Sequence, residues 1–306
     1  MVDAKMLDKM SSAPGFIAAL DQSGGSTPKA LRLYGVSESD YSGDEEMFRL
    51  VHAMRARIMS APAFSGDKVI AAILFERTMD GEVDGQAVPS YLWEKRGVVP
   101  FLKIDKGLEA EENGVQVMKP MPDLDALLIR ARQKGIFGTK MRSVIAHADK
   151  AGIAAVVKQQ FEVARQIIGH GLIPIVEPEV SIDSPTKQQA EAILRDEIAK
   201  ELDKLPAGEN VMIKLTIPTV ADLYAPLIAH KSVIRVVALS GGYSTEDACE
   251  KLSHNHGMIA SFSRALAENL RVTMSDAEFD ASLTKTIAQI YAASVDKSDV
   301  RESALV

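Results

Sequence analysis

Short apolar runs recur along the chain, and most are followed by a segment with the periodicity of an amphipathic helix. The runs are mostly aliphatic and do not alternate with polar residues, which is typical of strands buried on both faces of a parallel sheet. They occupy residues 15–20, 69–75, 97–103, 135–142, 171–177, 211–216, 234–240 and 257–263.

The segments between the runs predict helices. Apolar residues three and four positions apart form one stripe, at Val157, Phe161, Ala164 and Ile168. A second helix is expected to begin at Ser184–Pro185, with the serine as N-cap and the proline in the first helical position. Residues 105–133 predict a loop and then a helix, and the C-terminal segment predicts helices on the outside of the fold.

This alternation of strands and helices favours an α/β fold, a single (β/α)8 (TIM) barrel with additional helices at the C-terminus. The main alternative is a Rossmann-type sheet, which would place a GxGxxG turn directly after the first strand. The sequence there is DQSGGS (residues 21–26), which lacks that spacing. Because no Gly/Ser-rich or Pro-rich linker interrupts the chain, we expect residues 1–306 to form one barrel domain.

Composition limits the compartment and the partners. The 306 residues include 35 basic and 42 acidic side chains, a net charge of −7, which argues against a nucleic-acid-binding surface. The single cysteine, Cys249, excludes an internal disulfide, and the sequence contains no apparent signal peptide or membrane span. We therefore expect a soluble cytoplasmic protein with no nucleic-acid or membrane partner. The sequence does not indicate whether the chain forms a homo-oligomer.

Polar residues end most of the apolar runs. Active sites of barrels lie at the carboxyl ends of the strands, and a hydrophobic core does not require charged residues there. These residues are therefore candidates for a catalytic site, and they are Asp21, Lys103, Lys140, Arg142, Glu177, Lys214 and Ser240.

Lys214 is the candidate nucleophile. It lies between apolar residues in VMIKLTIP (residues 211–218), and burial together with nearby cations lowers the pKa of a lysine amine. If Lys103, Lys140 and Arg142 share its pocket, we expect a partly neutral amine that attacks a carbonyl carbon and forms a Schiff base. The alternative is a structural lysine whose amine reaches the rim of the barrel while its stem stays in the core.

Three carboxylates are placed to assist this amine. Glu177 and Glu179 lie two residues apart on one strand and so face the same side, where adjacent acids can raise the pKa of one of them and suit it to proton transfer. The alternative, which we favour for Glu179, is that they neutralise Lys140 and Arg142. Asp21 would reach into the mouth of the barrel or, alternatively, cap the segment that follows it.

Two groups of residues resemble phosphate sites. Ser240-Gly241-Gly242 leaves one strand with uncovered backbone N–H groups, and Ser263 and Arg264 leave the next. The second group lies on the opposite side of the mouth and consists of Ser23, Ser26 and Lys103. Two anion sites beside a reactive lysine indicate a substrate that is phosphorylated at both ends.

No metal site is expected. The 6 histidines are scattered, and the two nearest to each other, His254 and His256, precede the eighth run at the amino-terminal face of the barrel. We interpret both as surface residues. With a single cysteine, the sequence also offers no thiolate cluster for a metal.

Taken in order, these motifs resemble the class I fructose-bisphosphate aldolases, and a compact bacterial branch more than the longer animal enzymes. The resemblance rests on ALDQSGGS, ILFERT, LKIDKGL, GTKMRSVI, IVEPEV, MIKLTIP, LSGGYS and SFSRAL. It implies a TIM barrel that reversibly cleaves fructose 1,6-bisphosphate to dihydroxyacetone phosphate and glyceraldehyde 3-phosphate, in glycolysis or gluconeogenesis. The implied mechanism is a lysine Schiff base without a metal or other cofactor.

The resemblance also implies roles for the site residues. Lys214 corresponds to the Schiff-base lysine, Glu177 to the glutamate that moves protons during carbinolamine dehydration, and Asp21 to the aspartate that takes the hydroxyl proton as the carbon–carbon bond breaks. Lys140 corresponds to the cation beside the imine. The remaining residues correspond to the neighbours of that cation, Glu179 and Arg142, to the aldehyde-half phosphate site, Lys103, Ser23 and Ser26, and to the ketone-half phosphate site, Ser240, Gly241, Ser263 and Arg264.

The chain departs from the animal members of the family in two places. Gln22 stands where they have a glutamate after the first-strand aspartate. They also end in a tail whose terminal tyrosine is implicated in protonating the enamine, whereas this sequence ends RESALV and its last tyrosine, Tyr291, falls in a predicted helix. The sequence therefore does not identify the group that exchanges this proton.

Two other functions are consistent with the residues. One is another Schiff-base barrel, such as a transaldolase-like or deoxyribose-phosphate-aldolase-like enzyme, which handles a single phosphate. The other is a catalytically inactive phosphosugar-binding or scaffolding protein. A binding protein needs no imine-forming lysine, so the complete set of Asp21, Lys140, Glu177 and Lys214 argues against it.

Overall fold

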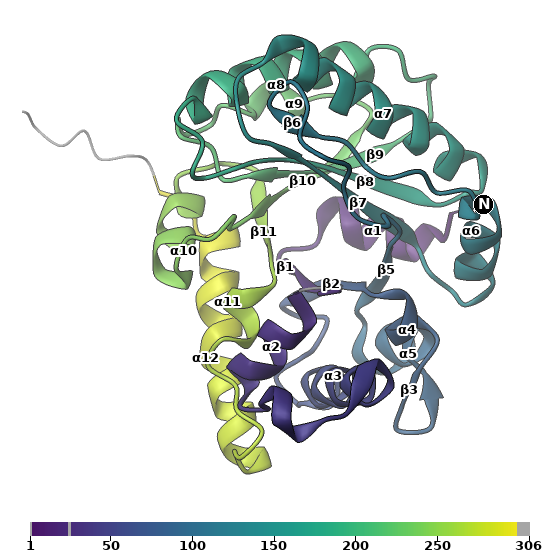
Figure 1. The fold of residues 1–306 in the computed structure, drawn as a ribbon, viewed down its shortest axis with the longest axis vertical. Helices are drawn as coiled ribbons and strands as arrows, with labels where there is room; N and C mark the ends of the chain where they lie inside the picture. The colour runs from purple at the N-terminus through teal and green to yellow at the C-terminus, as the bar shows by residue number, and fades with distance from the viewer. Residues whose placement is uncertain (1, 24–25, 299–306) are drawn as a thin grey trace, which may run out of the picture.

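The computed structural model describes residues 2–23 and 26–298, and these form a closed parallel β-barrel (Figure 1). Neighbouring strands follow the order β5-β2-β1-β11-β10-β9-β8-β7, and β5 pairs with β7 to close the ring. Each barrel strand overlaps one of the predicted runs, so the predicted TIM barrel is confirmed. The strands are β1 (Phe16–Leu20), β2 (Val69–Leu74), β5 (Val99–Lys103), β7 (Gly138–Ile145), β8 (Ile173–Val180), β9 (Val211–Thr216), β10 (Val233–Leu239) and β11 (Met258–Phe262).

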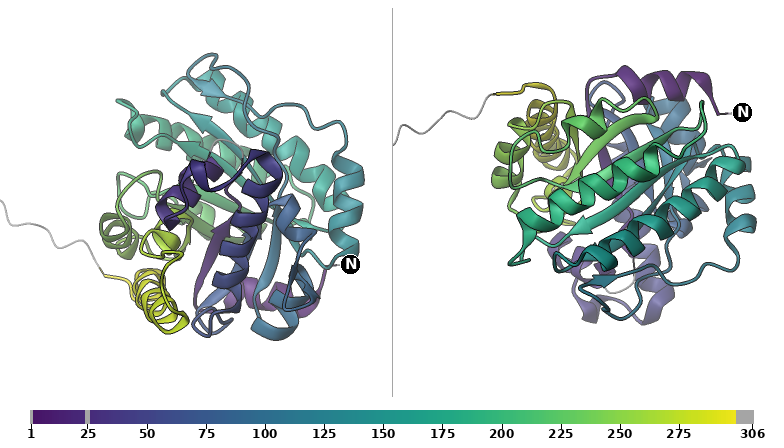
Figure 2. Two further views of the ribbon diagram at one scale, coloured as in Figure 1. Left: turned by 60° about the horizontal axis from the view of Figure 1, so that its bottom comes forward. Right: turned by 90° about the horizontal axis from the view of Figure 1, so that it is seen from above.

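Helices surround the barrel (Figures 1 and 2). The longer ones are α3 (Gly43–Ser60), α6 (Leu124–Gln133), α7 (Lys150–Gly169), α8 (Lys187–Leu202) and α12 (Asp276–Val295). The shorter ones are α1 (Ala4–Ser12), α2 (Ser26–Tyr34), α4 (Glu76–Met79), α5 (Val88–Ser90), α9 (Ala225–Ile228), α10 (Thr245–Ser253) and α11 (Arg264–Ala267), with a 3-10 turn at Glu38–Asp40 and a π-helical turn at Tyr91–Lys95. Outside the barrel, β3 (Glu82–Val83) pairs with β4 (Gln86–Ala87), and β6 (Val115–Gln116) pairs antiparallel with β7.

The predicted helices are present, with one boundary in the wrong place. The stripe around Phe161 lies on α7, which packs beside α8 (Figure 2), and the C-terminal helix α12 packs against α10 and β11. Helix α8 begins at Lys187, not at Ser184–Pro185. The Ser184 hydroxyl accepts the Thr186 N–H at 3.3 Å, and the Thr186 hydroxyl accepts the Ala148 N–H at 2.9 Å, so these residues form a turn before the helix.

Two apolar layers explain why the strands are buried on both faces. One layer lies between the barrel and its helices and contains alternate strand residues such as Phe16 and Ala18. The other fills the inside of the barrel with the intervening residues, such as Ile17 and Ala19. Met10 of α1 joins the inner layer, so this helix, behind the strands in Figure 1, closes the amino-terminal end. The opposite end is left open for a site.

In residues 2–23 and 26–298, no helix is both long enough and apolar enough to cross a bilayer.

Candidate active site

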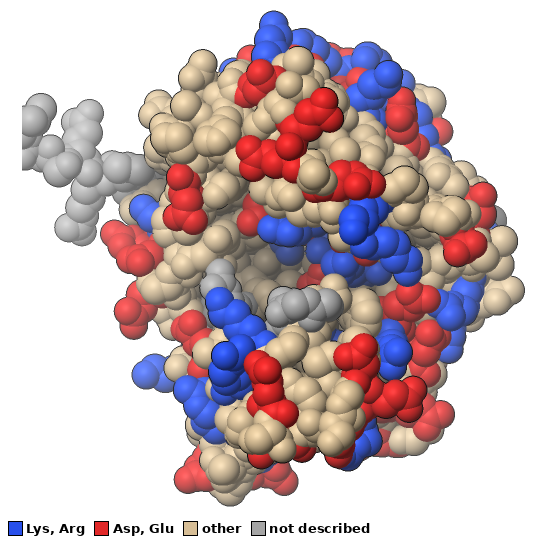
Figure 3. All heavy atoms as spheres, viewed as in Figure 1, with Lys and Arg blue, Asp and Glu red and all other residues tan. Residues whose placement is uncertain are grey.

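A cavity of about 710 Å³ lies at the carboxyl ends of the barrel strands. In Figure 3, lysine and arginine side chains gather around the hollow at the centre of this face. The structure brings together in this one cavity most of the residues predicted from separate runs. Its wall includes Asp21, Ser23, Lys103, Lys140, Arg142, Glu177, Glu179, Lys214, Ser240, Gly241 and Ser263.

Strand alternation places these side chains in the cavity. Met212 of β9 belongs to the core inside the barrel, and Lys214 lies two residues further along the same strand. Ile175 and Glu177 have the same relation on β8. On these two strands the inward-facing positions are therefore apolar in the amino-terminal part and charged where the strand reaches the cavity.

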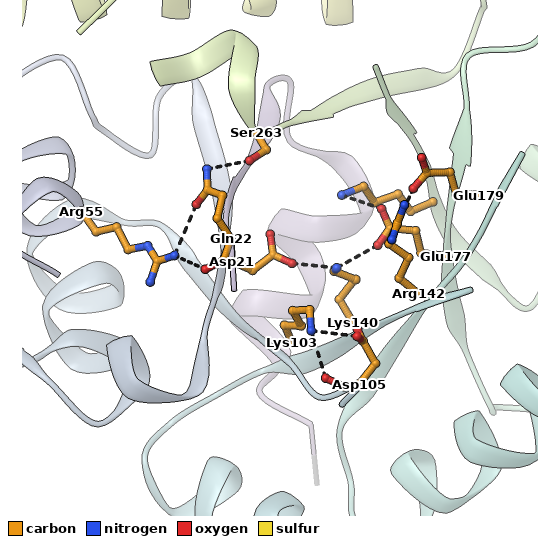
Figure 4. A network of polar contacts seen from close by, with 11 residues as sticks. Asp21, Gln22, Arg55, Lys103, Asp105, Lys140, Arg142, Glu177, Glu179 and Ser263 are labelled. Atoms are coloured by element: carbon orange, nitrogen blue, oxygen red, sulfur yellow. Dashed lines mark hydrogen bonds and ion pairs between the residues drawn. The ribbon is translucent and has the colours of Figure 1, made fainter. Parts of the chain in front are cut away.

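A chain of alternating charges crosses the floor of the cavity (Figure 4). The Lys140 Nζ lies 2.7 Å from Asp21 Oδ2 and 2.9 Å from Glu177 Oε2. The other oxygen of that glutamate, Oε1, lies 3.0 Å from the Lys214 Nζ. All four side chains are buried, with at most 9% of each exposed. Two carboxylates and two amines thus balance one another where little water reaches them.

The charges in this chain fix one another's protonation. Burial alone would raise the pKa of Asp21, but Lys140, Lys214 and Lys103 lower it to about 2. Burial opposes ionisation of Glu177 as well, yet Lys140 and Lys214 lower its pKa. Burial would lower the pKa of Lys140, and the two carboxylates raise it instead. At neutral pH both acids are ionised and Lys140 is a cation.

One electrostatic expectation from the sequence is wrong. The pKa of Glu177 is lowered, not raised by a neighbouring acid, because Glu179 pairs with Arg142 at 2.5 Å and Glu177 faces amines. Arg142, Lys140 and Lys103 do share the cavity with Lys214, as expected, and each of them contacts a carboxylate there. The sequence showed the cations but not their partners across the barrel.

The residues predicted for phosphate binding lie at the ends of four strands. Ser240 and Gly241 follow β10 and line the cavity, and Gly242 follows them outside its wall. Gly241 has a φ of 64°, and a Cβ there would lie 2.6 Å from Ile182 Cγ2, so the turn requires glycine. Ser263 follows β11, Ser23 follows β1, and Lys103 is the last residue of β5. The side chains of Ser26 and Arg264 lie outside the described residues.

The sequence analysis missed Gln160, a buried residue on α7. The paired residues of β8 and β9 end at Val176 on β8. The next backbone N–H on this strand, that of Glu177, donates a hydrogen bond to the Gln160 Oε1 at 2.8 Å. The Gln160 Nε2 donates to the Ser143 hydroxyl on β7 at 3.0 Å. Since this side chain holds the backbone at Glu177, it fixes where that carboxylate enters the cavity.

Three further cavity residues were also missed. The Lys103 Nζ donates to Asp105 Oδ1 at 2.7 Å and to the Asp105 carbonyl at 2.9 Å. The second carboxylate oxygen of Asp105 and the hydroxyl of Ser261 are buried without a hydrogen-bond partner in the structure, and Lys29 of α2 lines the opening. Asp105 lies two residues after Lys103 in LKIDKGL, just past the end of the apolar run. The criterion of polar residues at strand ends could therefore have found it.

In residues 2–23 and 26–298, no group of three or more His, Cys, Asp and Glu side chains is arranged to bind a metal ion. His254 contacts the Ser298 carbonyl and His256 contacts Asp222, both before β11 and away from the cavity.

Comparison with known proteins gives relatives along most of the chain. The family model described as fructose-bisphosphate aldolase class-I matches residues 5–221. The fructose-bisphosphate aldolase class 1 of Synechocystis sp. is 58% identical over 291 residues, which cover 95% of this chain and 97% of that protein.

Solved structures show the same fold at low sequence identity. A fructose-bisphosphate aldolase from Plasmodium falciparum, solved in complex with TRAP and a small-molecule inhibitor, has a TM-score of 0.74 at 18% identity and covers 98% of this chain and 97% of its own. A fructose-bisphosphate aldolase from Slackia heliotrinireducens has a TM-score of 0.56 at 13% identity, covering 97% and 89%. With the family model and the close relative, these findings show that the chain belongs to the class I fructose-bisphosphate aldolase family.

Proposed function

We propose that Lys214 is the amine with which this class I fructose-bisphosphate aldolase forms its Schiff base. The family assignment gives the activity, which is reversible cleavage of fructose 1,6-bisphosphate by a carbon–carbon lyase that uses a lysine imine and no metal. It also sets aside the single-phosphate enzyme and the inactive scaffold. The observation that carries the assignment of Lys214 is its contact with Glu177 Oε1 at 3.0 Å inside the cavity.

Glu177 is placed to move the protons that imine formation requires. Its ionised carboxylate takes a proton from the Lys214 ammonium, and the neutral amine then attacks the ketone carbon of the substrate. The carbinolamine that results loses its hydroxyl group as water, with the proton supplied by Glu177, and a protonated imine remains. The glutamate ends this sequence ionised, as it began.

Asp21 is placed to start the cleavage. Its carboxylate takes the proton of the C4 hydroxyl, the C4 oxygen forms the aldehyde, and the bond between C3 and C4 breaks. The electron pair of that bond moves into the protonated imine and gives an enamine, so the imine does the work that a metal ion does in other aldolases. Protonation of the enamine and hydrolysis of the imine then release dihydroxyacetone phosphate and restore the amine.

Lys140 keeps both acids ready for these steps. It contacts Asp21 and Glu177 at 2.7 and 2.9 Å and holds both as carboxylates. A carboxylate that is already ionised can accept a proton without first losing one. We therefore assign Lys140 an electrostatic role, and Arg142 and Glu179 a supporting one beside it.

The two phosphates are proposed to bind at different strand ends. Residues after β10 and β11 would hold the phosphate of the ketone half, and residues at β1 and β5 would hold that of the aldehyde half. The Lys103 Nζ contacts Asp105 in the structure, so a phosphate at that site shares this lysine with a carboxylate. The proposed contacts are Ser240, Gly241, Ser263 and Arg264 on the ketone side, and Ser23, Ser26 and Lys103 on the aldehyde side.

We propose that residues 1–306 form one domain and that the protein works in the cytoplasm on a small phosphosugar, without nucleic-acid or membrane partners. The net charge of −7 and the glycolytic family support this placement.

Replacement of Lys214 by methionine tests the assignment. We expect cleavage of the bisphosphate to fall by about a thousandfold or more while its binding, measured by calorimetry, persists, because the nucleophile is lost and the phosphate contacts are not. Lys158→Met is the matched control, since Lys158 lies on the outside of α7 with 73% of its side chain exposed. Cleavage by the Lys214→Met variant at the wild-type rate would overturn the proposal.

A further inference from the structure

A set of partly buried polar contacts links helix α3 to Ser263 at the end of β11, one of the proposed phosphate contacts (Figure 4). Arg55 of α3 is 1% exposed, and its guanidinium donates to the Gln22 carbonyl at 2.5 Å and to the Thr78 hydroxyl at 2.8 Å. The Gln22 Nε2 in turn donates to the Ser263 Oγ at 2.7 Å. We call these three residues the Arg55–Gln22–Ser263 chain.

Arg55 brings an unbalanced positive charge to this chain. Its hydrogen bonds go to a carbonyl, a hydroxyl and an amide oxygen, and no described carboxylate lies within ion-pair distance of it. Burial lowers the pKa of Arg55 to about 10, against the influence of Asp21, so the guanidinium is still charged at neutral pH. A buried cation of this kind favours an anion in the adjoining cavity, where Gln22 and Ser263 form part of the wall.

Arg55 also fixes the direction of the hydrogen bond to Ser263. A guanidinium only donates, so the Gln22 amide turns its oxygen toward Arg55, at 3.4 Å from Nη2, and its NH₂ group toward Ser263. The Ser263 oxygen therefore accepts, and its single proton stays available for another acceptor. A glutamate at position 22 would only accept and would take that proton.

We propose that Arg55 and Gln22 are positioning residues that make Ser263 a hydrogen-bond donor for a phosphate dianion and supply the site with positive charge. The phosphate is that of the ketone half, so the inference rests on the placement proposed above for Ser240, Gly241 and Ser263. Gln22 is the specificity-determining position, because an amide keeps the site neutral where a carboxylate would add a negative charge.

The test compares two ketones that differ only in the phosphate. Concentration-dependent trapping by borohydride measures the apparent Kd of dihydroxyacetone phosphate and of unphosphorylated dihydroxyacetone for each variant. For Gln22→Glu, which changes almost no volume, we expect the Kd of the phosphate ester to rise about tenfold or more, as for loss of a hydrogen bond to a charged group. The Kd of dihydroxyacetone should change less than about twofold, because no phosphate contact is involved.

Two comparisons separate this effect from charge or damage elsewhere. Gln133→Glu adds the same charge at an exposed position on α6, outside the cavity wall. It should leave both Kd values as in the wild type. The loss in Gln22→Glu should grow as the pH rises through about 6, where a phosphate monoester gains its second charge. Arg55→Lys keeps the positive charge but loses the planar guanidinium that donates to Gln22 and Thr78 at once. It should raise the KM for the bisphosphate with little change in kcat.

The outcomes are distinct. If Gln22→Glu binds the phosphate ester as the wild type does, or weakens both ketones equally, this inference is wrong and the Schiff-base assignment stands. If the wild type is trapped with neither ketone, the proposed function fails and the inference fails with it. Thermal unfolding of each variant shows whether equal weakening comes from a disturbed fold, which would also count against a phosphate-specific role.

Discussion

Replacing Lys140 with methionine tests whether charge holds the catalytic network together. Methionine keeps much of the length of the side chain and removes the ammonium, which lies 2.7 Å from Asp21 and 2.9 Å from Glu177. Of the two amines that contact these buried carboxylates, only that of Lys214 then remains, beside Glu177. The net charge of the site becomes more negative by one, and little water is present to stabilise the unpaired carboxylate.

The structure indicates the size of the effect. Removing one member of a buried ion pair destabilises a protein by about 3–5 kcal/mol. The lowering of the Asp21 pKa from 3.8 to about 2 corresponds by itself to about 2 kcal/mol, at about 1.36 kcal/mol per unit. Because that pKa is lowered by folding, the contribution is present above about pH 4 and is lost as the pH falls toward about 2.

Removal of Lys140 should reverse the sign of this dependence. Without their shared cation, burial and mutual repulsion raise the pKa of one of the two carboxyls above its unfolded value. A proton bound there stabilises the folded variant, so its free energy of unfolding should recover as the pH falls from about 7.5 to about 5. In the wild type, Asp21 and Glu177 both stay ionised over this range, because their pKa values are lowered.

Urea unfolding at the two pH values measures this difference. We expect Lys140→Met to be less stable than the wild type by about 3–5 kcal/mol at the higher pH, with the deficit about 1–2 kcal/mol smaller at the lower pH. Titration of all other groups cancels when wild type and variant are compared at one pH. A deficit below about 1 kcal/mol, as for an exposed pair, or one that is the same at both pH values, would refute the reasoning.

Three other experiments probe separate parts of the account. EDTA should leave the cleavage rate unchanged, and a loss that zinc restores would contradict the imine mechanism. Gln160→Leu removes the acceptor of the Glu177 N–H and should lower kcat by about tenfold with KM nearly constant, since no phosphate contact changes; a rise in KM alone would argue against this role. Asp105→Asn removes the charge that Lys103 faces and should tighten inorganic phosphate binding, measured by calorimetry, about threefold to tenfold. Unchanged phosphate binding would show that Lys103 does not contact the anion.

The barrel could be predicted from the sequence because its strands are buried on both faces. Each strand packs inward on the barrel core and outward on helices, so both faces are apolar and the run is continuous. A charged residue that ends such a run, such as Lys214 in β9, is conspicuous for the same reason. The start of α8 was misplaced because Thr186 bonds to a distant residue, Ala148, which the local pattern does not reveal.

The partners of the charged residues could not be predicted. Lys140 of β7 meets Asp21 at the end of β1, and these strands are not neighbours in the barrel. Arg55 and Gln160 lie on helices, where a polar residue is usually exposed, and their burial depends on how α3 and α7 pack on the barrel. Local pattern therefore identified the charges at the strand ends but not the contacts that set their protonation and position.

The most direct test of the central claim is to trap the covalent intermediate. Wild-type protein is incubated with dihydroxyacetone phosphate, reduced with borohydride, digested and analysed by mass spectrometry. The account predicts one modified peptide, with the reduced three-carbon phosphate attached to the Lys214 Nζ, and no such adduct in Lys214→Met. An adduct on a different lysine, or full cleavage activity with no trapped adduct, would contradict it.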